Sequence, residues 1–159
     1  MTTDIVIQRA TADDSHDIAI MVGELLNEIM AGTDTHAFNF NLPDTTARLT
    51  TFLDQEKYFV FIARSNALSP IGFIALYECH ALYTEGAFGT IPELYVRPGH
   101  RSRGLGLRLL QHAKLFSAAR GWKRLEVTTP PLPQFDSTLA FYEREGFTVS
   151  GGRKLKLIL

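Results

Sequence analysis

The stretch that most constrains this chain is residues 93–110, which reads ELYVRPGHRSRGLGLRLL. It predicts the end of a strand, a short basic turn that contains Gly99 and Gly104, and the start of a helix. Glycines let the backbone turn tightly, and the first amides of a helix lack intrahelical partners at the positive end of the helix dipole. The stretch is therefore typical of a site that binds a phosphate or pyrophosphate.

Length and composition limit the class of protein. At 159 residues, with no repeat and no long linker, we expect a single domain over residues 1–159. A formal net charge of −1 gives no basic field for nucleic acid, so no nucleic-acid partner is expected. Cys79 is the only cysteine, which excludes an internal disulfide framework and favours a reducing, cytoplasmic location. Because no leader peptide and no apolar run of roughly 18 residues is visible, we expect no membrane partner either.

Hydrophobic periodicity predicts strands and helices in alternation. The expected helices cover residues 15–29, 45–53, 104–120 and 137–145, and the expected strands cover residues 5–8, 58–63, 71–77, 90–96, 124–128, 147–150 and 154–159. Loops are expected at residues 32–42 and 81–89. This order predicts an α/β (α+β) fold in which helices cover the faces of a mixed sheet.

Two common nucleotide-binding motifs do not fit residues 93–110. A Rossmann fingerprint needs a third glycine where this chain has Leu109, and it belongs near the first strand of a chain. A Walker loop needs four residues between its glycines, followed by Lys and Ser or Thr, and this sequence is absent. Neither common nucleotide-binding motif therefore explains this stretch, and a glycine-containing turn on a solvated basic surface is the plainer interpretation.

The remaining pattern is Arg101-x-x-Gly104-x-Gly106, directly after a strand. It resembles the acetyl-coenzyme A signature of the GNAT family of N-acetyltransferases, and the segment FYEREGF at residues 141–147 resembles a second motif of that family. The element order also matches over essentially the whole chain. The resemblance implies the GNAT-like acyl-CoA N-acyltransferase fold: a mixed, mostly antiparallel twisted sheet of about six or seven strands with about four helices.

The resemblance also implies acetyl-CoA as cosubstrate, with no metal. Its pyrophosphate would be held by residues 101–106, namely Arg101, Ser102, Arg103, Gly104, Leu105 and Gly106. Its pantetheine arm would pair with a splayed strand at Leu94, Tyr95 and Val96. The Val96 amide is then a candidate donor to the thioester oxygen, where negative charge grows during amine attack.

Two residues are candidates for proton transfer. Tyr142 occupies the position of the family tyrosine that protonates the departing thiolate, although a helix tyrosine that only packs against the cofactor fits the same pattern. Glu93 is the candidate general base, with Glu78 and His80 as alternatives and a structural anchor as the plainer interpretation of Glu93. Strand alternation predicts that Glu93 shares a face with Ile91 and Tyr95.

The expected function is direct transfer of an acetyl group to a primary amine of a small molecule; a non-catalytic acyl-CoA sensor and an acetyltransferase acting on protein N-termini or lysines are the alternatives. Candidate substrate-binding residues are Phe38, Tyr77, Glu78 and His80, with Phe40 and Tyr83 in the same segments. A cleft edged by Glu78, Glu85 and Glu93 would favour a cationic amine.

Two further expectations concern the C-terminal part. Phe135 stands where the family commonly has Asn, so Asp136 or Ser137 is expected to cap the following helix. The apolar segment 155–159 is a candidate strand for pairing across a homodimer.

Overall fold

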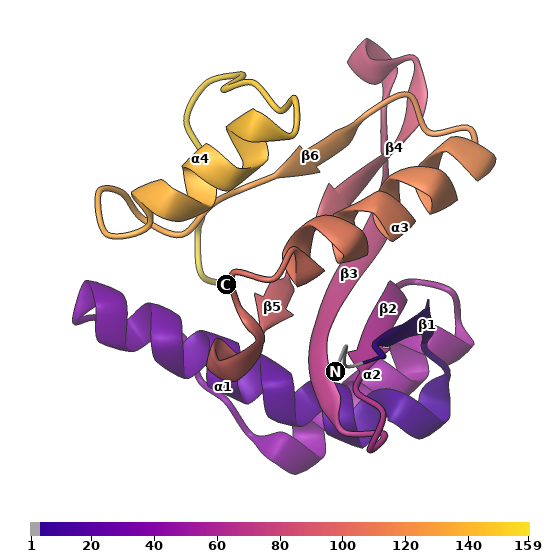
Figure 1. The fold of residues 1–159 in the computed structure, drawn as a ribbon. Helices are drawn as coiled ribbons and strands as arrows, with labels where there is room; N and C mark the ends of the chain where they lie inside the picture. The colour runs from indigo at the N-terminus through magenta and orange to yellow at the C-terminus, as the bar shows by residue number, and fades with distance from the viewer. Residues whose placement is uncertain (1–3) are drawn as a thin grey trace. The chain divides into compact units, whose positions relative to one another are not determined.

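The computed structural model describes residues 4–159 (Figure 1). The chain divides into two compact units, Met1–Thr128 and Thr129–Leu159. The single domain expected for the chain stays a prediction.

The first unit contains a six-stranded mixed sheet with the strand order β1-β2-β3-β4-β6, and β5 also pairs with β3. All pairs are antiparallel except β4 with β6, which are parallel. The strands are β1 (Val6–Arg9), β2 (Phe59–Arg64), β3 (Pro70–Ala81), β4 (Gly86–Ile91), β5 (Leu94–Val96) and β6 (Leu125–Val127). The helices are α1 (Ser15–Thr33), α2 (Leu42–Asp54) and α3 (Leu105–Ala119), with short 3-10 turns η1 (Ala12–Asp14), η2 (Leu82–Thr84) and η3 (Pro98–His100). The mostly antiparallel mixed sheet is confirmed.

Helix starts follow local capping chemistry. A capping box between Thr11 and Asp14 closes the turn that precedes α1. The Asn41 side chain accepts a hydrogen bond from the Asp44 amide at 2.9 Å, so α2 begins at Leu42 instead of residue 45. The predicted start was wrong because Pro43 fits the first turn of a helix and does not have to precede it.

The two faces of the sheet pack against different helices. Helices α1 and α2 cover one face, where Ile18, Met21 and Leu49 form a buried cluster with residues of β2, β3 and β5. On the other face, Phe116 of α3 lies with its ring 4.9 Å from that of Phe59 and 5.7 Å from that of Phe61. Figure 1 shows α3 crossing this second face. The candidate site lies on the α1 and α2 face and along the β5 edge.

The predicted strand at residues 90–96 is divided by a β-bulge. Thr90 pairs with Tyr77, and Leu94 pairs with Ile74. The three residues 91–93 therefore lie opposite only two residues of β3, 75 and 76. Pro92 lacks an amide hydrogen and therefore cannot donate to the ladder, which explains where the pairing breaks. The loop predicted at residues 81–89 was also wrong, because β3 extends to Ala81 and pairs with β4, which begins at Gly86.

The second unit contains one helix, α4 (Asp136–Arg144). Its N-cap residue is Phe135, which makes no side-chain capping hydrogen bond, so the cap expected from Asp136 or Ser137 was wrong. The strands predicted at residues 147–150 and 154–159 are absent from this described unit. Their alternating composition favours extended backbone, but a strand needs a pairing partner to form. Pairing across a dimer stays a prediction.

Candidate active site

The basic turn between β5 and α3 presents free backbone amides. Gly104 is the N-cap of α3 with φ +74°, a left-handed conformation that glycine adopts without strain. The first intrahelical hydrogen bond is donated by the Arg108 amide to the Gly104 carbonyl, so the amides from Gly104 to Leu107 have no helical acceptor. The first turn carries no acidic side chain. This arrangement suits an anionic ligand on geometric and electrostatic grounds.

Arg101 does not extend freely from this turn. Its Nε donates to the Val96 carbonyl at 2.8 Å and its guanidinium pairs with Glu28 at 2.8 Å. Arg101 thereby ties the turn to the end of β5 and to α1. Arg103 is exposed and has no ion-pair partner among residues 4–159. Of these two arginines, Arg103 is the one whose charge is available to a ligand.

The outer edge of β5 is open. In the antiparallel ladder with β3, the Ala75 amide donates to the Glu93 carbonyl and the Arg97 amide donates to the Ile71 carbonyl, each at 2.9 Å. Tyr95 therefore directs its backbone groups toward β3, whereas Leu94 and Val96 direct theirs away from it. Within the described chain no strand pairs with that edge, because β6 pairs only with β4 (Figure 1). An extended ligand can hydrogen-bond to Leu94 and Val96, but not to the Tyr95 backbone.

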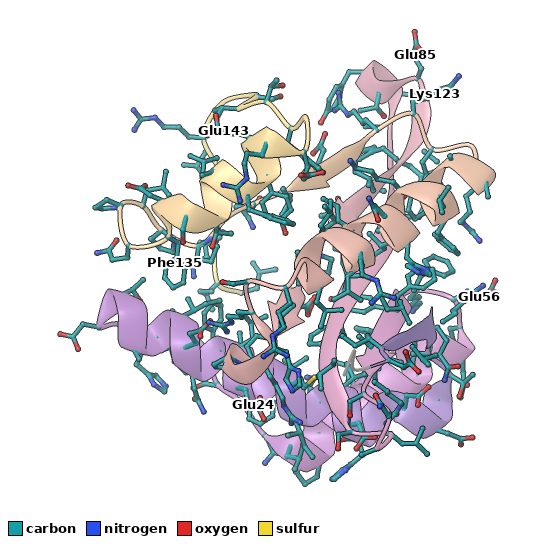
Figure 2. All side chains as sticks on the ribbon, in the orientation of Figure 1. Glu24, Glu56, Glu85, Lys123, Phe135 and Glu143 are labelled. Atoms are coloured by element: carbon teal, nitrogen blue, oxygen red, sulfur yellow. The ribbon has the colours of Figure 1, made fainter. Side chains whose placement is uncertain are left out.

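A charged network fixes the end of β5 against α1. The Arg97 guanidinium donates to both carboxylate oxygens of Glu24, at 3.0 and 2.9 Å, and the Tyr95 hydroxyl donates to the same carboxylate at 3.1 Å. The Arg97 bond lowers the pKa of Glu24, and burial raises the pKa of Tyr95 to about 12. Figure 2 labels Glu24 on α1. The Tyr95 side chain is thus structural, and its predicted role toward a cofactor stays a prediction.

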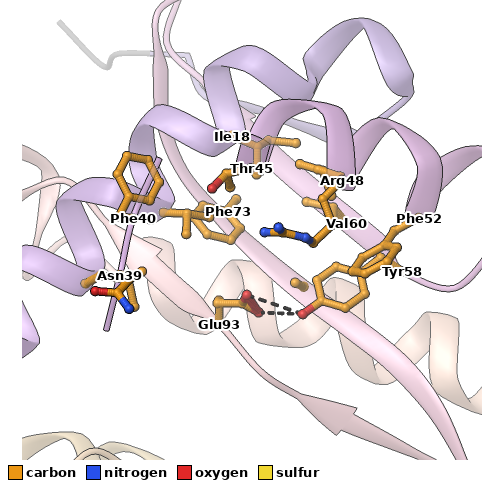
Figure 3. A pocket seen from close by; sticks show the side chains of 14 residues that line it. Ile18, Asn39, Phe40, Thr45, Arg48, Phe52, Tyr58, Val60, Phe73 and Glu93 are labelled. Atoms are coloured by element: carbon orange, nitrogen blue, oxygen red, sulfur yellow. Dashed lines mark hydrogen bonds between the residues drawn. The ribbon is translucent and has the colours of Figure 1, made fainter. Parts of the chain in front are cut away.

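A pocket of about 190 Å³ lies between α1, α2 and the sheet (Figure 3). Helix α2 presents Thr45, Arg48, Leu49 and Phe52 to it, at the spacing of one helical face. The remaining lining residues come from α1, the following loop and the strands: Ile18, Val22, Leu26, Asn39, Phe40, Tyr58, Val60, Phe73, Ala75 and Glu93. The walls are mainly apolar, and Glu93 is the only carboxyl group in the lining.

Glu93 has an unusual environment for a carboxyl group. Its two oxygens accept hydrogen bonds from the Tyr58 hydroxyl, both at a long 3.3 Å. Burial raises the pKa of Glu93 to about 7, and the Tyr58 hydrogen bond only partly opposes this shift. Burial also raises the pKa of Tyr58, so its hydroxyl remains a donor. Near neutral pH, Glu93 can therefore both accept and release a proton.

The bulge decides which residues share the face of Glu93. Thr90 pairs with Tyr77, and the Thr90 hydroxyl lies 3.2 Å from the Cys79 sulfur. The Tyr77 ring stacks on the Tyr58 ring, with the ring centroids 6.0 Å apart. Glu93 therefore shares its face with Thr90 and Tyr95. The predicted partner Ile91 was wrong, because the extra residue of the bulge shifts the alternation by one position.

The structure does not bring the other predicted acidic and histidine residues to this pocket. Glu78 accepts a hydrogen bond from the Trp122 indole at 2.7 Å, on the opposite face from Tyr77, and His80 lies 3.5 Å from Glu78. Glu85 is exposed in the turn after β3 (Figure 2). Only one of the three carboxylates expected to edge a cleft therefore lines the pocket, and Phe38 and Tyr77 also lie outside its lining.

Sequence reasoning missed several lining residues, including Asn39, Arg48 and Tyr58. The spacing of Thr45, Arg48 and Phe52 marks one face of α2 and could have indicated Arg48. Nothing in the sequence indicated that Tyr58 reaches Glu93, since the two residues meet only through the pairing of β2, β3 and β5.

Tyr142 belongs to the second unit. It lies in α4, its ring contacts Phe141 at 5.1 Å and Phe147 at 5.2 Å, and it is buried. Burial raises the pKa of Tyr142, which keeps the phenol protonated at neutral pH. Its role as an acid stays a prediction.

Residues 4–159 contain neither a membrane-spanning helix nor a metal-binding cluster. No helix in this range is long and apolar enough to cross a membrane. The same residues contain no group of three or more His, Cys, Asp or Glu side chains placed to hold a metal ion.

Solved acetyltransferases share this fold. A putative acetyltransferase from Arthrobacter sp. FB24 is 27% identical, with a TM-score of 0.74 over 97% of this chain and 92% of that one. The ribosomal-protein-alanine N-acetyltransferase from Brucella melitensis biovar Abortus 2308 is 17% identical, with a TM-score of 0.75 over 98% and 100% of the two chains. An aminoglycoside N-acetyltransferase in complex with CoA is 13% identical, with a TM-score of 0.78 over 99% and 97%. The fold is therefore that of the acyl-CoA N-acyltransferases.

A family model matches as well. Residues 56–149, more than half of the chain, match the acetyltransferase (GNAT) domain. The chain belongs to the GNAT family and is an acyltransferase, as the motifs at residues 101–106 and 141–147 predicted. The family uses acetyl-CoA as its acetyl donor. No curated protein sequence matches the chain significantly.

Proposed function

We propose that this protein is an acetyl-CoA-dependent N-acetyltransferase that transfers the acetyl group directly to the primary amine of a small molecule. The observation that carries the proposal is Glu93: a carboxyl group with a pKa near 7, at a bulge, between an apolar pocket and an open strand edge. A protonated amine must lose a proton before it attacks, and a base with a pKa near the working pH is best suited to accept it.

The cofactor fits the free backbone groups of the chain. The amides at the start of α3 would hold its pyrophosphate, and the outer edge of β5 would pair with its pantetheine arm. Bound acetyl-CoA supplies an activated acetyl thioester. The Val96 amide points to the open edge and would donate to the thioester oxygen, where it stabilises developing negative charge.

The proton transfers balance the reaction. A C–N bond forms and the C–S bond breaks. Glu93 accepts one proton of the ammonium group before attack, Tyr142 donates a proton to the departing thiolate, and the second proton lost by the attacking nitrogen restores the Tyr142 phenol. The raised pKa of Tyr142 keeps that proton available at neutral pH. Glu93 can pass its proton to solvent near pH 7 and so regain the basic form.

Titration calorimetry with acetyl-CoA tests binding, and release of free thiol across a panel of amines tests transfer. Binding at micromolar concentration with amine-dependent thiol release is the expected result. Binding without thiol release from any amine would favour a non-catalytic sensor instead. Tyr142→Phe is expected to lower turnover about 10- to 100-fold with cofactor binding unchanged, and unchanged turnover would remove Tyr142 from the mechanism.

A further inference from the structure

The pocket contains an arginine that is not neutralised by the protein. Arg48 lines the pocket and forms no ion pair or hydrogen bond with any residue in the range 4–159. Most other arginines of the first unit do have a carboxylate partner within 4.0 Å: Arg9, Arg64, Arg97, Arg101, Arg120 and Arg124. Of the arginines without such a partner, Arg48 is the one that lines the pocket that also contains Glu93.

A local partner for Arg48 is present but not used. Asp44 is four residues earlier in α2, at the spacing at which an acid and an arginine normally pair on a helix surface. Figure 3 shows the Arg48 side chain directed into the pocket, between Phe73 and Tyr58. The guanidinium is therefore available to an anion in the pocket, and its planar donors suit a carboxylate.

The walls and the size of the pocket limit the rest of the ligand. Phe40, Phe52 and Phe73 contribute apolar surface. The volume of about 190 Å³ is smaller than the roughly 300–1,000 Å³ of sites for drug-sized molecules. A ligand of several sugar rings, or a long polycation beside Arg48, does not match this pocket in size or charge.

We propose that the acceptor is a small apolar or aromatic amino acid, whose amine lies at Glu93, whose carboxylate pairs with Arg48 and whose side chain packs against the phenylalanines. This inference rests on the proposed function, because it treats the pocket as the acceptor site. It replaces the expectation of a purely cationic amine, which depended on Glu78 and Glu85 lying in the same cleft. Arg48 is a specificity-determining residue in this arrangement, whereas Glu93 serves any amine.

The test compares acceptors that differ in one group. L-Phenylalanine and L-leucine carry both charges, phenethylamine lacks the carboxylate of phenylalanine, and spermidine is a polycation. Thiol release is measured for the wild type, for Arg48→Gln and Arg48→Lys, and for Lys123→Gln as a control. Lys123 is an exposed cation outside the pocket lining (Figure 2), so the control removes the same charge elsewhere.

The wild type is expected to prefer at least one of the amino acids over phenethylamine by about 10- to 100-fold in kcat/KM, as one charge-assisted hydrogen-bonded pair allows. Arg48→Gln should abolish this preference, because it lowers kcat/KM far more for the amino acids than for phenethylamine. Arg48→Lys should restore part of the preference, and Lys123→Gln should retain all of it. A wild-type preference for spermidine or phenethylamine, or an equal loss on all acceptors in Arg48→Gln, would overturn the inference.

A second readout separates this inference from the proposed reaction. Calorimetry measures the binding of phenylalanine and leucine to the protein with and without CoA. If no acceptor releases thiol, the transfer reaction is wrong, and binding of an amino acid that Arg48→Gln weakens would still support the site. If thiol is released from other amines while neither amino acid binds, the reaction stands and the amino-acid site is overturned.

Discussion

The two sides of β5 use different parts of the polypeptide. On its open edge, the groups available to a ligand are backbone amides: Leu94, Val96 and the first turn of α3 after Gly104. On the pocket side, they are side chains from α1, α2, the loop between them, strands β2 and β3 and the residues that precede β2 and β5, with Glu93 and Arg48 as the charged members. Backbone groups fit any ligand of the same shape, whereas side chains select one chemistry. We therefore expect the edge to bind the donor that the family shares and the pocket to select the acceptor.

Removing the carboxyl group from the pocket should have the largest effect. Glu93→Gln is expected to lower kcat/KM about 10²- to 10⁴-fold, the usual contribution of a general base, because glutamine cannot accept the amine proton. Acetyl-CoA affinity, measured by calorimetry, should stay within about two-fold because the edge is intact. If Glu93→Gln abolishes both cofactor binding and activity, acetyl-CoA binding depends on Glu93 and the two sides of β5 do not act independently.

The same substitution should stabilise the fold at alkaline pH. The folded-state pKa of Glu93 is raised from 4.5 to about 7, so folding favours the protonated form. The contribution of this group to stability is then fully present below pH 4.5 and is lost as the pH rises through about 7. Urea unfolding at pH 8 should give Glu93→Gln about 1–3 kcal/mol more stability than the wild type, with little difference near pH 4.5. A variant less stable at pH 8 would mean that the ionised carboxylate supports the structure.

Perturbing the start of α3 should weaken donor binding and leave the pocket intact. Gly104 has φ +74°, and a methyl group added there would meet open space, so Gly104→Ala adds backbone strain without a clash. We expect about 1 kcal/mol lower stability and a several-fold weaker acetyl-CoA affinity. Gly99→Ala is the matched control, since Gly99 also has open space and no positive φ. Equal effects of the two substitutions on affinity would remove the special role of the Gly104 conformation.

The hydrogen bond between Tyr58 and Glu93 tunes the pocket. Because this bond lowers the pKa of Glu93, Tyr58→Phe should raise that pKa further. The acidic limb of the kcat/KM profile should then move upward by about half a unit to one unit of pH, so that activity falls near pH 7 and recovers near pH 9. If the pH profile of kcat/KM does not move, its acidic limb reports the titration of a group other than Glu93.

The smallest effect is expected at Arg101. Arg101→Gln removes the links to Val96 and Glu28, both on the surface, and should cost about 0.5–1 kcal/mol of stability measured by urea unfolding. Arg103→Gln, at the same turn but without those contacts, should leave stability unchanged and reduce the salt dependence of CoA binding. The reverse outcome would mean that Arg101 binds the cofactor and Arg103 supports the fold.

The sequence predicted the local geometry at the start of α3 better than that of the pocket, for a physical reason. Gly104 and Gly106 follow a strand and open a helix, and this local chemistry is readable because the residues that matter are neighbours in the chain. Glu93 and Tyr58, by contrast, meet across 35 positions, and only the strand register brings them together. The pattern of apolar residues specified the sheet, but it could not reveal the extra residue at Pro92 that sets the face of Glu93.

The alternation along β5 also gives the protein a built-in reporter. The Tyr95 amide lies inside the ladder with β3, whereas the Leu94 and Val96 amides face the open edge. Amide hydrogen exchange should therefore be slow at Tyr95 and fast at both neighbours in the free protein. Any ligand that completes this edge would slow exchange at Leu94 and Val96 and leave Tyr95 unchanged, so three adjacent residues can report occupancy of the donor side before any reaction takes place.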